Sequence, residues 1–132
     1  MKISIKVITI FHYLTLCYVI FLTLLLLLPH PGVLLFGWSP SEDVRDYSHL
    51  FSFMVLGFLF ELDRRRFSFE FLGLVLLCYA ICTEIGQIFF PPRVFDLEDI
   101  MQNFAGIVIG LEIGNIIKNI SQFFIRFFCN KK

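Results

Sequence analysis

The stretch FHYLTLCYVIFLTLLLLL, residues 11–28, decides the fold class of this chain. It lies within a longer segment, residues 7–41, that contains no Asp, Glu, Lys or Arg. About 20 consecutive apolar residues are enough for a helix to cross a bilayer. Pro29 and Pro31 follow directly, and proline cannot continue a helix. We therefore predict a membrane-spanning helix over about residues 7–28.

A cleaved signal peptide is the alternative interpretation of this segment, because Lys2 and Lys6 precede it like a basic n-region. The apolar core is longer than the roughly 7–15 residues of a typical signal peptide, and no A-x-A-like cleavage site follows it. These two features favour a helix that is retained.

The composition of the whole chain supports a membrane protein. Hydrophobic residues make up 58% of its 132 residues and charged residues only 17%, and 18 residues are Phe. A chain of this length has too little interior to hide so much apolar surface from water. Low hydrophobicity is the signature of disorder, so a disordered chain is excluded as well. The formal net charge is zero, which gives no basic field to attract nucleic acid.

Three further hydrophobic segments follow, at about residues 47–62, 69–90 and 97–117. The first of these is only about 24 Å long as a helix, so it spans only with a thinned bilayer or with polar ends at the interfaces. Phenylalanines around Arg126 predict an amphipathic tail at about 119–132. We predict one all-α membrane domain over residues 1–132, a bundle of four transmembrane helices. The alternative has three spans, with the second segment re-entrant.

The basic residues predict the orientation of this bundle. Nine of the eleven lie before residue 7, in the connection at 62–70, or after residue 117, and with four spans these regions share one side. Only Arg45 and Arg93 fall on the other side. We therefore predict that both termini are cytoplasmic. An odd number of spans would place the C-terminal lysines outside.

In this topology, eight polar residues come to one depth near the extracytoplasmic surface. They lie at the outer ends of the second, third and fourth helices and in the connection between the last two. We predict that they form a ligand-binding or functional cluster: Asp46, His49, Glu84, Gln87, Arg93, Asp96, Asp99 and Asn103.

Helical spacing places several of these residues on shared faces. Asp46 and His49 are three residues apart, as are Glu84 and Gln87, so each pair shares a helix face. A charged residue within the bilayer costs from about 2.5 kcal/mol upward, so such residues pair or line a polar cavity. Glu84 lies deepest and needs a partner, for which His49 and Arg93 are the candidates.

The fourth helix carries a polar and small-residue stripe. Asp99 and Asn103 are four residues apart, and Gly106 and Gly110 continue the same face. Glycines at this spacing allow two helices to approach closely in lipid. We assign Gly106 and Gly110 to helix packing, which would bring the polar end of the stripe into the bundle.

Each polar residue also has a purely structural interpretation. His49 is compatible with an ordinary interfacial histidine, and Glu84 with a structural ion pair. Asp96, Glu98 and Asp99 are compatible with a solvated loop and the start of a helix, where acidic residues are favoured. Their convergence at one depth favours a functional site. The sequence contains no CxxC pair, Gly-rich phosphate loop or HExxH motif, so we expect no cofactor and no metal.

Two stretches resemble the VanZ-like family of small integral membrane proteins. They are HLFSFMVLG at residues 49–57 and EIGQIFFPPRVFDLEDIMQNFAG at residues 84–106, followed by Gly110. The resemblance covers about residues 40–118. It departs from the family pattern at two places: Arg45-Asp46 replaces an Asp-Lys pair, and Pro91-Pro92 replaces Pro-Gly.

The resemblance implies a multi-pass protein of the bacterial plasma or inner membrane. The family takes its name from a protein linked to teicoplanin resistance, so the resemblance suggests a role in glycopeptide resistance. It implies a class of protein and no particular activity. The expected partners are membrane lipids, with a lipid-linked wall precursor or a lipoglycopeptide as the candidate ligand.

Three functions are compatible with these residues. The first is a non-enzymatic protein that binds a lipid-linked or anionic ligand at the outer cluster, with Arg93 on a phosphate or carboxylate. The second is a membrane enzyme in which His49, Glu84 and Asp99 act as acid or base, or in which Glu84, Asp96 and Asp99 hold a divalent cation. No nucleophile with a placed base is visible, so an enzyme is less favoured. The third is a structural scaffold.

Overall fold

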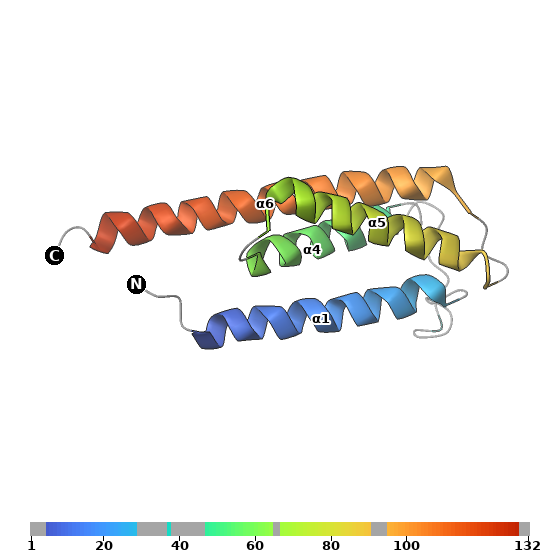
Figure 1. The fold of residues 1–132 in the computed structure, drawn as a ribbon, viewed down its shortest axis with the longest axis horizontal. Coiled ribbons are helices and arrows are strands. Elements are labelled where there is room, and N and C mark those ends of the chain that lie inside the picture. Colours follow the sequence, from blue (N-terminus) through green and yellow to red (C-terminus); the bar gives the residue numbers. More distant parts are fainter. Residues whose placement is uncertain (1–4, 29–36, 38–46, 65–66, 91–94, 130–132) are drawn as a thin grey trace.

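The computed structural model describes residues 5–28, 37, 47–64, 67–90 and 95–129, and throughout these ranges the chain forms helices and short connections. Figure 1 shows the four helices. They are α1 (Ile5–Leu27), α4 (Ser48–Asp63), α5 (Phe69–Gln87) and α6 (Leu97–Cys129). The expectation of an all-helical chain is therefore confirmed for the part that the structure describes.

The helices begin where the sequence supplies capping groups. The hydroxyl of Ser68 accepts a hydrogen bond from the backbone N–H of Phe71 at 3.1 Å, which satisfies one of the free donors at the start of α5. The carboxylate of Asp96 accepts from the backbone N–H of Glu98 at 2.9 Å at the start of α6. Both interactions stabilise helix starts that lie close to an end of an apolar segment.

Two helix ends differ from the sequence-based boundaries. α5 ends at Gln87, and the N–H of Phe90 bonds to the Gln87 carbonyl in a turn before the two prolines. α6 does not end near residue 117. It continues through Lys118 to Cys129, for 33 residues, because no proline or glycine interrupts the chain after Gly114. The segment predicted as a separate tail thus belongs, as far as Cys129, to the same helix.

α4 and α6 form the most extensive helix pair in the bundle. A Cβ atom on Gly106 would collide with the Leu50 carbonyl oxygen, and one on Gly110 with the Met54 carbonyl oxygen. Gly57 on α4 has the reciprocal relation, since its Cβ would lie 2.7 Å from the Ile107 carbonyl oxygen. Only glycine at these positions allows the two backbones to approach so closely.

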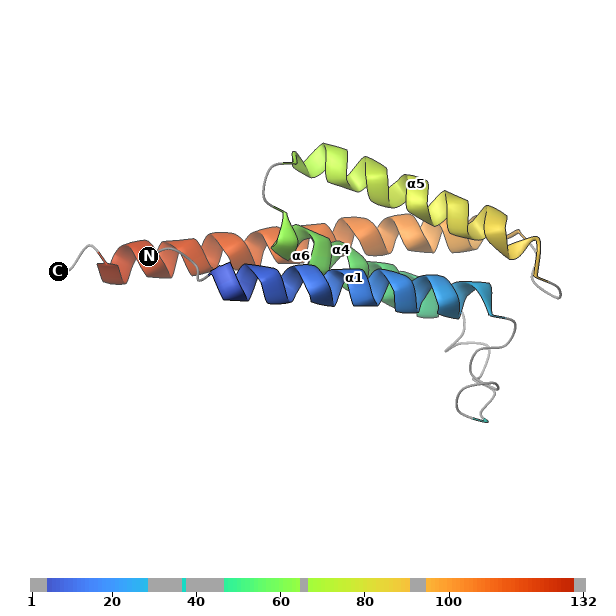
Figure 2. The ribbon, with the colours of Figure 1, turned by 60° about the horizontal axis from the view of Figure 1, so that its bottom comes forward.

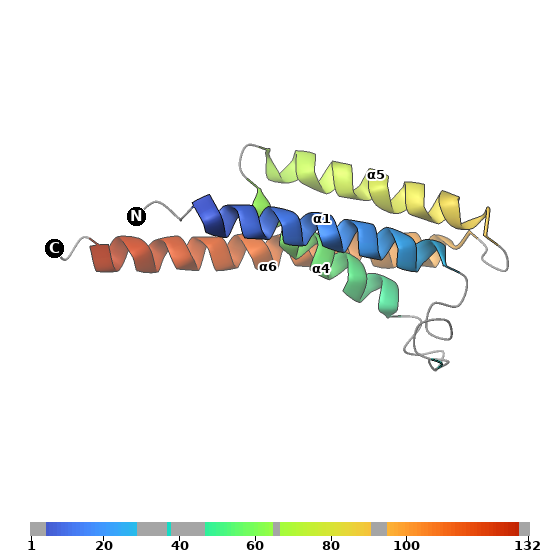
Figure 3. The same cartoon turned by 90° about the horizontal axis from the view of Figure 1, so that it is seen from below.

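The other two helices pack around this pair. α1 packs against α4 and α5, and α5 packs against α6. Figures 2 and 3 show α5 running lengthwise beside the other helices, and its Leu72 and Leu76 side chains belong to the shared core. Hydrogen bonds also join α1 to its neighbours: the Tyr18 hydroxyl donates to the Ser52 carbonyl at 2.9 Å, and the hydroxyls of Thr23 and Tyr79 are 2.8 Å apart.

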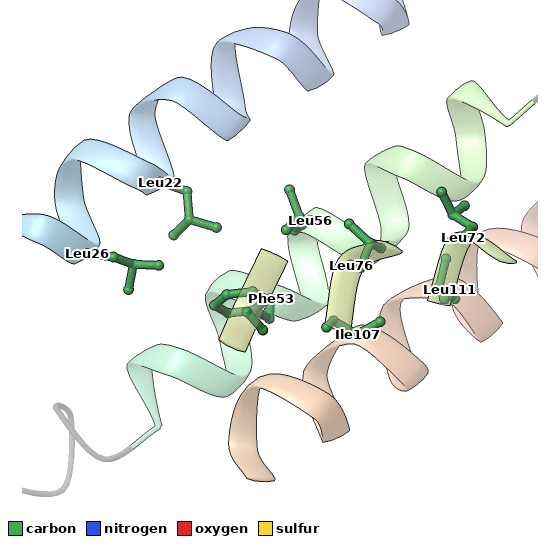
Figure 4. Packing of buried hydrophobic residues seen from close by; sticks show 9 residues of the cluster. Leu22, Leu26, Phe53, Leu56, Leu72, Leu76, Ile107 and Leu111 are labelled. Atoms are coloured by element: carbon green, nitrogen blue, oxygen red, sulfur yellow. The ribbon is translucent and has the colours of Figure 1, made fainter. Parts of the chain in front are cut away.

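The core is apolar and receives side chains from all four helices (Figure 4). Phe53 and Leu56 of α4 are fully buried at its centre. Large apolar side chains also remain exposed along every helix, for example Ile20, Leu74 and Phe104. An apolar exterior around an apolar core is what a bilayer requires of a protein it surrounds.

Among the residues that the structure describes, three helices are long and apolar enough to cross a membrane: Thr9–Leu27 within α1, Phe69–Gln87, and Leu97–Phe124 within α6. α4, with 16 residues, is about 24 Å long and is shorter than a typical span. The start of α1 and the end of α6 lie at the same end of the bundle (Figure 1). The fold is therefore that of an all-helical membrane protein.

Candidate functional site

The predicted polar residues that the structure describes lie near the start of α4, the end of α5 and the start of α6. Figure 1 shows these helix ends towards the end of the bundle opposite the start of α1 and the end of α6. His49 lies in the first turn of α4, Glu84 in the last turn of α5, and Asp99 in the first turn of α6. Each helix starts or stops here, so three side chains from distant parts of the sequence project into one region.

His49, Glu84 and Asp99 form the centre of this region. One ligand atom from each, a ring nitrogen or a carboxylate oxygen, lies within 4.8 Å of the others. The His49 Nε2 atom is 3.6 Å from Asp99 Oδ2. Residue exposure is 6% for His49 and 0% for Glu84, whereas the Asp99 side chain retains 25%. The centre is buried on the α4 and α5 sides and reaches the surface through α6.

Asp96 contributes to the region by its backbone. Its N–H donates to Glu84 Oε1 at 3.1 Å, while its own carboxylate is exposed and caps the start of α6. The sequence pattern placed Asp96 among the candidate ligand-binding side chains. In the structure its carboxylate accepts a hydrogen bond from the Glu98 N–H at the start of α6, and its backbone amide donates to the buried Glu84.

Gln87 and Asn103 lie one helical turn after Glu84 and Asp99, and each is 1% exposed. Within the described part of the chain, neither side-chain amide has a hydrogen-bond partner for its oxygen or its nitrogen. Nδ1 of His49 and Oε2 of Glu84 are also buried without a partner there. A buried donor or acceptor left unsatisfied costs about 1–3 kcal/mol, and natural structures contain few of them.

Asp46 and Arg93, the other two predicted members, lie outside the described residues. The three central residues carry two carboxylates, Glu84 and Asp99, against one histidine. With neutral histidine and both carboxylates ionised, these three residues have a formal charge of −2, and a buried charge is stabilised by a partner or a bound cation or is removed by protonation. This electrostatic imbalance is the main chemical feature of the site.

A second buried polar cluster, which the sequence patterns did not reveal, lies at the opposite end of the bundle. Glu61 on α4 is fully buried, and its Oε1 atom lies 2.9 Å from Arg64 Nη2 and 3.4 Å from Lys118 Nζ. Lys118 also donates to the Glu61 carbonyl at 2.8 Å. An acidic residue between Phe60 and Leu62, three residues before an arginine, was the available signal.

These features define a class: an all-helical membrane protein with a buried polar site at one end of its bundle. The chain belongs to the VanZ/LLP1 family, whose family model matches residues 9–118. The match confirms the family resemblance and extends it over α1, which the sequence motifs had left out. Searches of curated proteins and of solved structures found no match.

Proposed function

We propose that this protein binds the polar head of a lipid-anchored ligand in its buried polar site. The observation that carries the proposal is the set of buried groups on His49, Glu84, Gln87 and Asn103 that have no hydrogen-bond partner among the described residues. Together these groups offer both donors and acceptors. A head group with hydroxyls, amides or a phosphate would satisfy them, while its hydrocarbon tail would stay in the surrounding bilayer.

We further propose that the site opens to the extracytoplasmic side of the bacterial cell membrane. The support is the distribution of charge: nine of the eleven basic residues fall in regions that four spans would place in the cytoplasm. In this proposal α4 crosses as a short fourth helix beside α6, and both termini are cytoplasmic.

A thiol-labelling experiment tests this orientation. Glu98→Cys and Ser68→Cys are made separately in a protein whose native cysteines have been replaced, because these positions are exposed at opposite ends of the bundle. An impermeant maleimide should label the residue at 98 in intact cells and the residue at 68 only after lysis. The reverse pattern would contradict the orientation.

The ligand class that fits both the site and the family is a lipid-linked wall precursor or a lipoglycopeptide such as teicoplanin. Both combine sugar hydroxyls and amides with a hydrocarbon anchor. The family relationship supports a role in glycopeptide resistance, as suggested by the sequence resemblance. Binding of either ligand would keep the drug away from its target or alter access to it.

The test is teicoplanin susceptibility in a sensitive Gram-positive host that expresses the protein. The wild type should raise the inhibitory concentration, and Glu84→Ala should abolish the increase at matched membrane expression. Glu98→Gln is the matched control, because Glu98 is exposed and adjacent to Asp99. Equal susceptibility with and without the wild-type protein in the membrane would remove the resistance role.

Asn103→Leu separates a binding site from a structural network. The two side chains have similar size, and the change removes a buried amide that has no partner in the described part of the chain. We therefore expect the free energy of unfolding to stay equal or rise by about 1 kcal/mol while binding of labelled teicoplanin in nanodiscs is lost. A destabilised protein that still binds would favour the scaffold.

Catalysis is the second candidate function, and the short His49–Asp99 distance is the observation that favours it. A histidine beside a carboxylate is the arrangement of many general bases. Glu84→Gln distinguishes the two functions, since glutamine retains an acceptor for the Asp96 amide but cannot exchange a proton. The substitution should abolish turnover by an enzyme and only weaken a binding protein.

A further inference from the structure

We propose that His49, Glu84 and Asp99 bind a divalent transition-metal cation. The sequence offered a divalent cation only within the enzyme alternative, on Glu84, Asp96 and Asp99. The structure brings His49 to Glu84 and Asp99, and these three donors come from three different helices. The inference deepens the proposed function and rests on it in one respect, that the polar site binds something and is not a structural network.

The geometry is close to that of a metal site. Zinc bonds to histidine nitrogen and carboxylate oxygen at about 2.0–2.2 Å, so ligand atoms in a tetrahedral site lie about 3.4 Å apart. The 3.6 Å separation of His49 Nε2 and Asp99 Oδ2 already matches this value. All three ligand atoms fall within 4.8 Å. Small side-chain rotations of Glu84 would bring its carboxylate to the same distance.

The charge of the three central residues favours a bound cation. Two carboxylates and a neutral imidazole give −2, and a divalent cation makes the described site neutral. The arginine and lysine side chains that the structure describes, apart from Arg126 near the end of α6, lie in the Glu61 cluster at the other end of the bundle. Glu84 is fully buried, so solvent screens its charge little.

Unpartnered buried groups supply the independent observation that points to a ligand. Glu84 is fully buried, and its Oε2 atom has no hydrogen-bond partner in the described residues. The amides of Gln87 and Asn103 lie one turn away in the same condition. Their oxygens are suited to complete the coordination or to accept hydrogen bonds from water on the metal.

The donor set narrows the choice of metal. An imidazole nitrogen with two carboxylates and no sulfur favours Zn²⁺ or Mn²⁺ over Ca²⁺ and Mg²⁺, which prefer oxygen alone. The same cation would explain how a site rich in carboxylates accepts an anionic head group. A metal at this position would present positive charge to a phosphate that Glu84 and Asp99 alone would repel.

Metal loading of purified protein tests the inference without any lipid ligand. Full-length protein in detergent is stripped with a chelator and dialysed against Zn²⁺ or Mn²⁺ alone, and bound metal is measured by elemental analysis. We expect about one ion per chain and a melting temperature several degrees higher than that of the stripped protein. His49→Ala and Asp99→Asn should lose both effects, and Glu98→Gln should retain both.

Two results of the metal-loading experiment would overturn the inference. A folded wild type that retains no ion overturns the inference, as does equal retention by Asp99→Asn and Glu98→Gln. Asp99→Asn and Glu84→Gln preserve side-chain volume, so they keep the test valid if His49→Ala does not fold. Metal-loaded protein that binds no teicoplanin would overturn only the proposed function. Protein that binds teicoplanin but retains no metal ion would overturn only the metal site.

Discussion

Gly110→Ala tests whether α4 and α6 pack backbone against backbone. A Cβ atom at this position would lie 2.8 Å from Phe58 N and 2.9 Å from the Met54 carbonyl carbon, besides colliding with the Met54 carbonyl oxygen. Ordinary contacts begin near 3.4 Å. The two helices must therefore separate locally by at least about 0.6 Å. Overpacking of this kind costs about 1–3 kcal/mol.

Gly73→Ala is the matched control, because it makes the same change within a helix without the collision. Its Cβ would meet only Leu111 Cδ1, at 3.7 Å. Alanine favours the helix over glycine by about 1 kcal/mol at either position, so the comparison cancels this gain. Gly110→Ala should therefore be less stable than Gly73→Ala by about 1–3 kcal/mol.

The assay is thermal unfolding in dodecyl maltoside micelles, followed by near-UV circular dichroism, which reports the packing of aromatic side chains. Elution as a monodisperse species before heating shows that each variant is folded. Melting of Gly110→Ala at the same temperature as Gly73→Ala, or above it, would refute the close approach of α4 and α6. The same packing brings His49 towards Asp99, so Gly110→Ala should also weaken ligand or metal binding.

Three further changes probe interactions elsewhere in the bundle. Glu61→Ala should lower the free energy of unfolding by about 1–3 kcal/mol, less than for a fully buried pair because Lys118 reaches solvent. An equal loss from Glu61→Ala in a Lys118→Met background would contradict coupling between the two residues. Tyr79→Phe should lower the free energy of unfolding by about 0.6 kcal/mol through loss of the hydrogen bond to Thr23. The same Tyr79→Phe change made in a Thr23→Val background should cause no further loss. Ser68→Ala should cost about 1 kcal/mol and increase hydrogen exchange at the start of α5; unchanged protection would rule out the cap.

Much of the candidate site was predictable because its residues occupy helix ends. The polar residues interrupt apolar segments near their boundaries, and the alternation of spans brings those boundaries to one end. His49, Glu84, Gln87, Asp99 and Asn103 were identified in this way. The role of the Asp96 amide was not predictable, since a backbone donor leaves no trace in residue type.

The Glu61 cluster shows where such reasoning fails. The distribution of basic residues identified the arginines after α4 as a signal for orientation. That signal depends only on their charge and their position in the sequence. The contact between Glu61 and Lys118 joins residues 57 positions apart. It forms because Gly114 leaves room for the Glu61 side chain against α6, where a Cβ atom would lie 2.8 Å from it. No local pattern encodes that fit.

The sequence by itself determined the membrane class, the helices and the family, because hydrophobic length, helix breakers and ordered motifs are local properties of the chain. It also determined that polar residues would collect at one end. Only the tertiary structure decided that α4 pairs most closely with α6, that Glu84 is fully buried, and that His49, Glu84 and Asp99 bring their ligand atoms together. Those outcomes depend on the rotation and close approach of whole helices, which steric packing sets and residue spacing along one helix does not.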